Sequence, residues 1–158
     1  MVRGYLAGGY EEVTGVANRL EQGPAFGAPA TYAAESDDWS CYRHDAGRSG
    51  GTQVAIPTDS VKLWEVEAGA PLSSVELEEA KKEMLTRITA PVISQGKVFV
   101  VSIETHNLRV FDALTGVPRW NYVLGGRADT PPTVYKGRCY IGCNDGWVYC
   151  FQVSDGTL

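Results

Sequence analysis

The stretch APVISQGKVFVVSIETHNLRVFDALTGVPRW, residues 90–120, is followed by a second version of itself, PPTVYKGRCYIGCNDGWVYCFQVSDGTL, residues 131–158. Gly96 corresponds to Gly137, an offset of 41 residues, and Gly116 corresponds to Gly156, an offset of 40. A period of about 40 residues, made of short apolar runs and tight turns, is typical of a β-propeller blade. The sequence therefore predicts an all-β fold: two to three four-stranded antiparallel blades of a partial propeller.

Tryptophan spacing extends the repeat in both directions. Trp120 stands four residues after Gly116, and the same spacing would place the next tryptophan beyond the last residue, so we expect the chain to be a fragment of a longer repeat protein. Trp64 is followed five residues later by Gly69, as Trp120 is followed by a glycine at the same distance. Together with the alternating apolar residues of the segment 60–69, this predicts a strand and a third, partial copy.

The remaining segments divide the chain. Residues 1–36, rich in glycine and alanine, are interpreted as a lead-in or the end of a preceding element with a weak helical pattern over 11–22, and residues 37–158 as the truncated repeats. The insert 73–88 is predicted to be a short amphipathic helix, because Ser73 and Glu76 form a capping box. It would lie on the rim of the propeller or serve as a docking element for a partner.

The end of the first copy has the residues of a tight turn. Asp112 can cap the backbone of the turn, Gly116 can take the left-handed conformation, and Trp120 is expected to pack against the next sheet. His106 is interpreted as a turn residue. The run KVFVVSI, residues 97–103, lacks clean alternation, which predicts a strand buried on both faces.

The second copy contains three of the four cysteines. Asp145 and Gly146 predict a two-residue type I′ hairpin, which would put Cys139, Cys143 and Cys150 on one sheet face as small apolar residues. A shared zinc ion is excluded for the first two, because four residues of strand separate them by roughly 13 Å. A disulfide of Cys150 would need a shifted register.

Composition excludes some partners. The net charge is −5 with a pI near 5.0, and no basic run is present, which argues against nucleic acid or an anionic membrane as a partner. No run of about 20 apolar residues and no secretory signal is visible. Membrane insertion is therefore not expected.

The segment DDWSCYRHDAGRSGG begins at residue 37 and has two interpretations. It is either a binding loop or a structural loop, in which Trp39 and Tyr42 anchor it to the sheets while Arg43 stacks on an aromatic ring or pairs with an aspartate. His44 has no clustered partner in the sequence, which favours the structural interpretation.

The pattern D-x-x-T-G-x-x-x-W, formed by Asp112, Thr115, Gly116 and Trp120, resembles the tryptophan-docking repeat of the pyrroloquinoline quinone (PQQ), or quinoprotein, β-propellers. The lead-in residues Trp39, Tyr42 and Arg43 resemble a segment that precedes the first blade in planctomycete-like bacterial members. The resemblance also makes the following residues structural positions of the repeat: Trp64, Gly96, Gly137, Asp145, Gly146 and Gly156.

No combination of a nucleophile, a base and an orienting group appears in the sequence, which favours a function without a catalytic site in this chain. The leading hypothesis is a non-catalytic binding or scaffold domain of a larger bacterial protein of the periplasm or cell envelope, with protein partners. An alternative is a PQQ-dependent alcohol or sugar dehydrogenase whose calcium and quinone site lies in other blades. The adjacent cysteine pair of those enzymes is absent from this sequence, and no cofactor is expected here. A third hypothesis is a scaffold of the outer-membrane assembly type, which recognises partners by strand addition.

Overall fold

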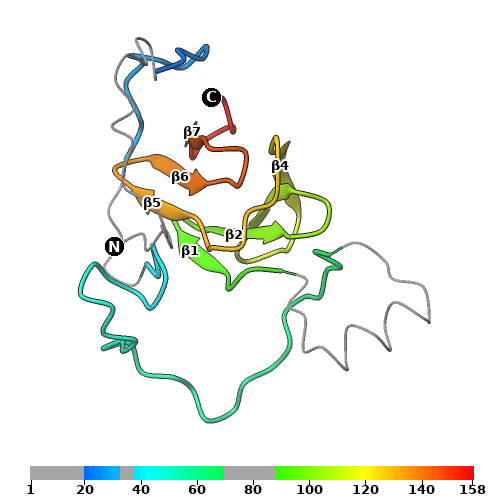
Figure 1. Ribbon diagram of the computed structural model, residues 1–158. Coiled ribbons are helices and arrows are strands. Elements are labelled where there is room, and N and C mark those ends of the chain that lie inside the picture. Colours follow the sequence, from blue (N-terminus) through cyan, green and yellow to red (C-terminus); the bar gives the residue numbers. More distant parts are fainter. Residues whose placement is uncertain (1–19, 33–37, 70–87) are drawn as a thin grey trace, which may run out of the picture.

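The computed structural model describes residues 20–32, 38–69 and 88–158, and their strands form two antiparallel sheets that stack face to face (Figure 1). The first sheet has the order β1(Val92–Ser94), β2(Lys97–Ser102), β3(Asn107–Asp112), β4(Pro118–Val123). The second has the order β5(Thr133–Tyr135), β6(Arg138–Gly142), β7(Val148–Gln152). The predicted all-β architecture of consecutive blades is confirmed, and the described residues contain no helix.

The first hairpin of each sheet uses the same two-residue turn. Gln95 and Gly96 have φ angles of 52° and 65°, and Lys136 and Gly137 have φ angles of 47° and 74°. Two successive left-handed residues make a type I′ turn, whose twist matches that of the flanking strands. The flanking pairs, such as Ser94 with Lys97, confirm a two-residue connection. Both copies therefore begin with the same local fold.

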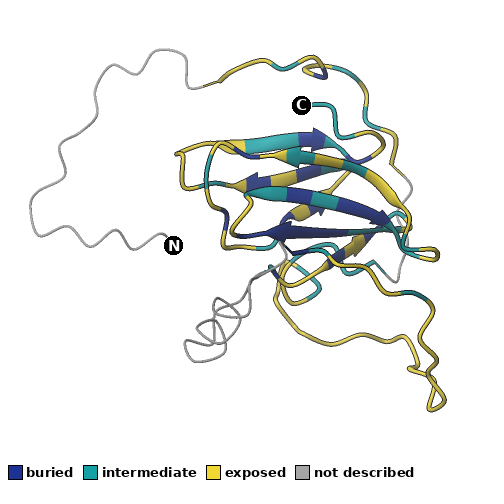
Figure 2. Cartoon of the chain, turned by 90° about the vertical axis from the view of Figure 1, so that its right-hand side faces the viewer, coloured by how far each residue is buried: buried dark blue, intermediate teal, exposed yellow. Residues whose placement is uncertain are grey.

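The core lies between the two sheets (Figure 2). The first sheet contributes the fully buried Phe99, Val101 and Leu108, and the second contributes Ile141 and Phe151. Alternate residues of a strand point to opposite faces, which explains why these side chains come from every second position.

Strand β2 is buried on both faces, as its continuous apolar run predicts. Phe99 and Val101 face the second sheet, while Val100, on the opposite face, is only 4% exposed. Its neighbour Phe111 on β3 is also 4% exposed and shares that face, since it pairs with Val98. Strand β2 is thus covered on both sides.

The strand predicted within residues 60–69 is wrong. This segment pairs with no strand of the described residues, and Val61 and Leu63 are 78% and 72% exposed. Alternating apolar residues form a strand only where a neighbouring backbone offers hydrogen-bond partners. Here only its second half touches the first sheet, through Trp64 and through the carbonyl of Glu67, which accepts from Arg109 Nη1 at 3.1 Å.

The two-residue hairpin predicted at Asp145 and Gly146 is also wrong. Gly142 pairs with Val148, and the nitrogen of Cys143 donates to the carbonyl of Trp147 at 3.0 Å, so the loop has three residues. The side chain of Asp145 accepts from the nitrogen of Trp147 at 3.0 Å, and Gly146 takes a φ of 92°. A turn followed by a left-handed glycine is the usual three-residue connection.

The longer loop moves one cysteine to the other face of the sheet. Cys150 pairs with Tyr140 instead of Ile141, so it lies opposite the face that carries the buried Cys139. The prediction that three cysteines share a face therefore fails for Cys150. All four cysteines are free thiols.

The helix predicted over 73–88 falls outside the described residues except for Ile88, which forms a bridge with Ser102. The weak helical pattern over 11–22 also lies outside them, apart from its last three residues, which are not helical. Within the described ranges, no helix has the length and apolarity needed to cross a bilayer.

Candidate functional site

Two tryptophans lie flat against glycines of the turn that follows the third strand of a sheet. Trp120, on β4, donates from Nε1 to the carbonyl of Val153 at 3.1 Å, and a Cβ placed on Gly156 would come within 2.6 Å of its ring. Trp64 donates to the carbonyl of Ala113 at 3.0 Å, and a Cβ on Gly116 would come within 2.7 Å of its ring. The same contact therefore occurs twice, one repeat apart.

The turns that receive these rings are built alike. The nitrogen of Gly116 donates to the carbonyl of Asp112 at 2.9 Å, and that of Gly156 donates to the carbonyl of Gln152 at 3.0 Å. Their φ angles are 70° and 76°, a conformation that glycine adopts cheaply. Asp112 Oδ1 accepts from the nitrogen of Thr115 at 2.9 Å and from its hydroxyl at 2.8 Å. The predicted turn cap is confirmed.

Trp120 is embedded in a cluster of aromatic rings. Its centroid lies 6.0 Å from that of Phe99 in the first sheet and 6.0 Å from that of Phe151 in the second. Tyr122, two residues along β4, lies 4.7 Å from the ring of Phe151. These rings fix the relative position of the two sheets.

Asp112 also pairs with a cation. Arg119 Nη2 lies 2.6 Å from its Oδ2, and this bond, with those from Thr115, holds the pKa of Asp112 well below its ordinary value of 3.8. A carboxyl whose pKa is lower in the folded than in the unfolded state stabilises the fold above its ordinary pKa. This stabilisation is lost as the pH falls toward the folded pKa.

We expect Asp112→Asn to show this dependence. The gap in melting temperature between the native chain and the variant should be widest near neutral pH and should narrow as the pH falls below about 4. Arg119→Gln removes the main cause of the lowered pKa of Asp112. This variant should therefore also melt at a lower temperature than the native chain near neutral pH. Thermal denaturation followed by circular dichroism from pH 7 to pH 2 measures it. A gap that is constant across this range would contradict the assignment.

The lead-in loop crosses the first strands of both sheets. The nitrogen of Ile93 on β1 donates to the carbonyl of Trp39 at 2.9 Å, and the nitrogen of Val134 on β5 donates to the carbonyl of Ser40 at 2.7 Å. Asp38 Oδ2 accepts from the hydroxyl of Ser94, at the end of β1, at 2.6 Å. The loop therefore bridges the two copies of the repeat at their first strands.

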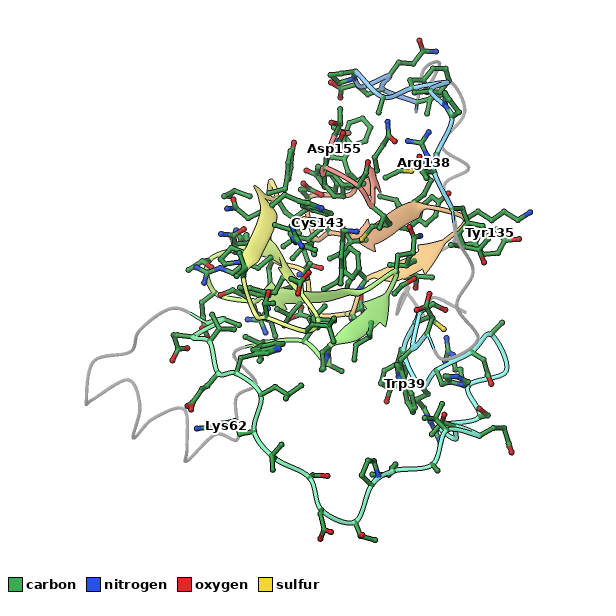
Figure 3. All side chains as sticks on the ribbon, turned by 180° about the vertical axis from the view of Figure 1, so that it is seen from behind. Trp39, Lys62, Tyr135, Arg138, Cys143 and Asp155 are labelled. Atoms are coloured by element: carbon green, nitrogen blue, oxygen red, sulfur yellow. The ribbon has the colours of Figure 1, made fainter. Side chains whose placement is uncertain are left out.

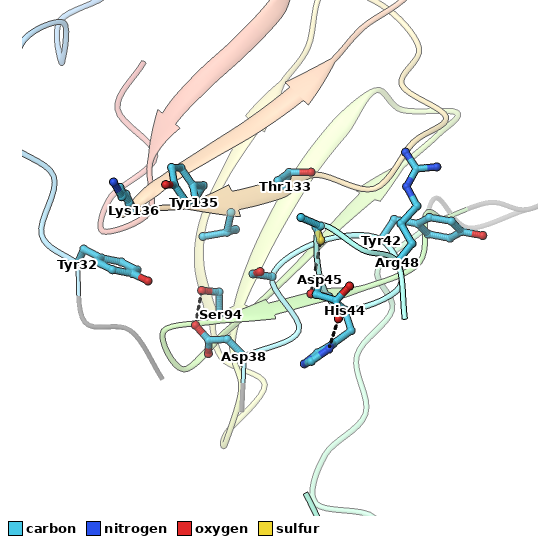
Figure 4. Close-up of a pocket in the computed structure, with 14 residues that line it drawn as sticks. Tyr32, Asp38, Tyr42, His44, Asp45, Arg48, Ser94, Thr133, Tyr135 and Lys136 are labelled. Atoms are coloured by element: carbon cyan, nitrogen blue, oxygen red, sulfur yellow. Dashed lines mark hydrogen bonds and ion pairs between the residues drawn. The ribbon is translucent and has the colours of Figure 1, made fainter. Parts of the chain in front are cut away.

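A cavity of about 600 Å³ opens between this loop and β5 (Figure 4). Its wall combines aromatic rings with charges of both signs, as in Tyr32, Asp38, Tyr42, Arg48, Tyr135 and Lys136. A site of this size, with charged and hydroxyl groups set among tyrosine rings, suits binding of a polar ligand or a peptide segment.

The three residues predicted to hold the loop have different surroundings in the structure. Trp39 is half-buried, and its ring lies 4.9 Å from that of His44 in the same loop. Its contact with the first sheet is the backbone bond to Ile93. Tyr42 is 53% exposed beside the cavity, and its prediction as an anchor is wrong. Arg43 is exposed and its side chain lies beside Gly50 of its own loop. The loop turns back on itself there, since the nitrogen of Gly50 donates to the carbonyl of Arg43 at 3.0 Å.

Sequence reasoning missed the contacts that hold the linker between the sheets. The hydroxyl of Tyr149 donates to Asp145 Oδ2 at 2.5 Å and accepts from the nitrogen of Gly125 at 3.2 Å. The first bond raises the pKa of Tyr149 and lowers that of Asp145. It also missed the cavity residues Tyr135 and Lys136, whose positions carry no motif, and it gave Asp38 no role within the segment that begins at residue 37. Among the described residues, no three His, Cys, Asp or Glu side chains gather as metal ligands would.

Comparisons with known proteins agree with the repeat. A family model described as outer membrane protein assembly factor BamB matches residues 57–158. The serine/threonine-protein kinase AfsK of Streptomyces griseus is 31% identical over 112 residues, which are 71% of this chain and 12% of the kinase. The chain therefore spans about an eighth of that curated relative.

Solved structures give a more distant likeness. BamB from Moraxella catarrhalis has a TM-score of 0.41 and 18% identity, with 44% of this chain and 22% of that chain covered. The quinohemoprotein alcohol dehydrogenase ADHIIG from Pseudomonas putida HK5 has a TM-score of 0.40 and 19% identity, with 44% and 12% covered.

Proposed function

Because the chain belongs to the family of PQQ-like repeat proteins whose model carries the description of BamB, we propose that it is a non-catalytic binding and scaffold module of a larger bacterial protein. The observation that carries the proposal is the loop of Trp39 and Ser40, which crosses β1 and β5 and leaves a cavity of about 600 Å³ beside them. A stack of sheets is a rigid support for such a loop surface.

In this proposal the tryptophans are docking residues between blades. The indole rings of Trp64 and Trp120 each lie against a glycine of the next turn, and each donates a hydrogen bond to a backbone carbonyl there. A large ring with a satisfied donor contributes both buried area and orientation. Trp120 therefore holds the turn after β7 against β4, and Trp64 holds its own segment against the turn after β3.

The partners proposed are proteins, and the proposed compartment is the cell envelope. The family description names a protein that serves outer membrane protein assembly, and protein partners suit a cavity with tyrosines at its rim. Tyrosine combines a rigid apolar ring with a polar tip and is enriched in interfaces.

A photo-crosslinking experiment tests this function. The photoreactive residue p-benzoylphenylalanine replaces Tyr42 or Tyr135, both of which line the cavity and are more than half exposed. We expect a discrete protein adduct in cells at each of these positions. The control is Leu114, which is 78% exposed on a turn outside the cavity and should give no such adduct. Equal adducts at all three positions would contradict a cavity that binds a partner.

The enzymatic alternative has its own test. The full-length protein that carries this chain is incubated with PQQ and calcium, desalted, and assayed for quinone absorbance and for dye-linked oxidation of alcohols and sugars. The proposal predicts that the desalted protein shows no quinone absorbance and no oxidation of alcohols or sugars. Quinone retention with oxidation would assign a dehydrogenase and overturn the non-catalytic function.

A further inference from the structure

Residues 38–40, called the strap below, bind equivalent positions in the two copies of the repeat. The carbonyl of Trp39 accepts from the nitrogen of Ile93 at 2.9 Å, and the carbonyl of Ser40 accepts from the nitrogen of Val134 at 2.7 Å. Ile93 and Val134 are the central residues of β1 and β5, and they lie 41 residues apart, as the glycines of the two-residue turns do. Two successive carbonyls of the strap therefore accept from the same backbone donor of neighbouring copies.

These two donors lie on the free edge of the first strand of each sheet. One edge of β1 pairs with β2 and one edge of β5 pairs with β6, so the opposite edges face the strap. Both donors are therefore positioned by strands of the described chain. The edge of a sheet is an ordinary binding site for extended backbone.

The carboxylate of Asp38 adds a side-chain contact to these backbone bonds. Its Oδ2 accepts from the hydroxyl of Ser94 at 2.6 Å, and its Oδ1 accepts from the nitrogen of Gln95 at 3.2 Å (Figure 4). Ser94 is only 2% exposed, and a buried hydroxyl without a partner is costly. The equivalent residue of the second copy is Tyr135. The site thus favours a carboxylate, and only at the first copy.

The strap is held by polar bonds and is followed by a strained loop. The ring of Trp39 contacts His44 of its own loop, and in Figure 3 Trp39 lies outside the stack of the two sheets. Arg43, His44 and Arg48 have φ angles of 60°, 81° and 54°, a left-handed conformation that strains residues with a β-carbon. Another peptide can replace polar bonds of this kind at little net cost. Release of the strap would also relieve the strain of the loop.

We propose that the strap is an internal ligand, and that an extended acidic segment of the protein partner displaces it. The segment places a carboxylate on Ser94 and offers its next two carbonyls to Ile93 and Val134. The strap forms one wall of the cavity, since Asp38 and Ser40 line it, so its displacement joins the cavity to both strand edges. The inference rests on the proposed binding function and states the chemistry of its partner.

A synthetic peptide tests the site in the full-length protein that carries this chain. The probe is fluorescein-labelled DWSSYR, the sequence of residues 38–43 with Cys41→Ser. Fluorescence anisotropy should show saturable binding to the Asp38→Ala variant and roughly tenfold weaker binding to the native protein, in which the strap competes. The peptide NWSSYR, which lacks the carboxylate, should bind the variant roughly tenfold more weakly than DWSSYR.

Two buried serines separate the site from other effects. Added to Asp38→Ala, Ser94→Ala should weaken binding of DWSSYR roughly tenfold and leave that of NWSSYR unchanged. The matched control is Ser102→Ala, because Ser102 on β2 is also fully buried and should leave both unchanged. Hydrogen exchange should show the amides of Ile93 and Val134 less protected in Asp38→Ala and protected again by DWSSYR. Circular dichroism confirms that the variants fold.

Crosslinking in cells tests the competition with the partner. With p-benzoylphenylalanine at Tyr135, the protein adduct should increase several-fold when Asp38→Ala releases the strap, because the competent state becomes more populated. Ser94→Ala breaks the same contact from the other side and should also increase the adduct. Ser102→Ala should leave it at the native level.

The proposal has clear contrary outcomes. Equal binding of DWSSYR and NWSSYR, or no binding of either to Asp38→Ala, would overturn the site. An adduct at Tyr135 that Asp38→Ala leaves unchanged or reduces would show that the strap is a fixed part of the module and not a competitor. Either result, with adducts at Tyr42 and Tyr135 of the native protein, would leave the proposed function standing without a displaceable strap.

Discussion

The variant Trp120→Ala should lower the free energy of unfolding by about 3 kcal/mol, near the low end of the range for a large ring in a core. The ring contacts Phe99 and Phe151 on different sheets, and its loss leaves a cavity between them. It also leaves the carbonyl of Val153 without its donor, which adds the desolvation cost of a buried acceptor. Urea denaturation followed by circular dichroism measures the change.

The control for this substitution is Trp147→Ala. Trp147 is 44% exposed in the loop before β7, and its removal should cost less than about 1 kcal/mol. Because Trp120 joins the two sheets, its loss should also broaden the transition, which appears as a smaller dependence of the unfolding free energy on urea. Equal costs for the two tryptophans would show that Trp120 does not hold the sheets together.

Local signals in the sequence predicted the fold well. The matching glycines, which recur in both copies, and the spacing shared by Trp64 and Trp120 predicted stacked antiparallel sheets, because each signal depends on a few neighbouring residues. The cap by Asp112 and the left-handed Gly116 followed from the same local chemistry. The burial of β2 on both faces followed from its continuous apolar run.

The wrong predictions concern features that depend on residues far apart in the chain or on a shift of one residue in the strand register. The side chain of Asp145 bonds to the nitrogen of Trp147 and lengthens the hairpin by one residue, which moves Cys150 to the other face. The segment 60–69 has the alternation of a strand but pairs with no described strand. The cavity is formed by residues far apart in the chain, such as Tyr32 and Tyr135, whose proximity no local pattern encodes.

The substitution Gly156→Ala should cost about 3 kcal/mol, and its matched control Gly96→Ala about 1 kcal/mol. Both glycines have left-handed φ angles, 76° and 65°, so both variants carry the same backbone strain. They differ in surroundings: a Cβ at Gly96 meets nothing within 4 Å, whereas one at Gly156 overlaps the ring of Trp120. The difference of about 2 kcal/mol therefore measures the cost of displacing the indole.

A double-mutant cycle isolates this contact. In the Trp120→Ala background the added methyl group has room, so Gly156→Ala should then cost only the backbone strain of about 1 kcal/mol, as Gly96→Ala does. Chemical denaturation of the two single variants and the double variant gives the coupling energy. If the free-energy costs of the two substitutions simply add, the ring of Trp120 does not rest on Gly156 in solution. The conclusion that this indole contact holds the two sheets together would then be wrong.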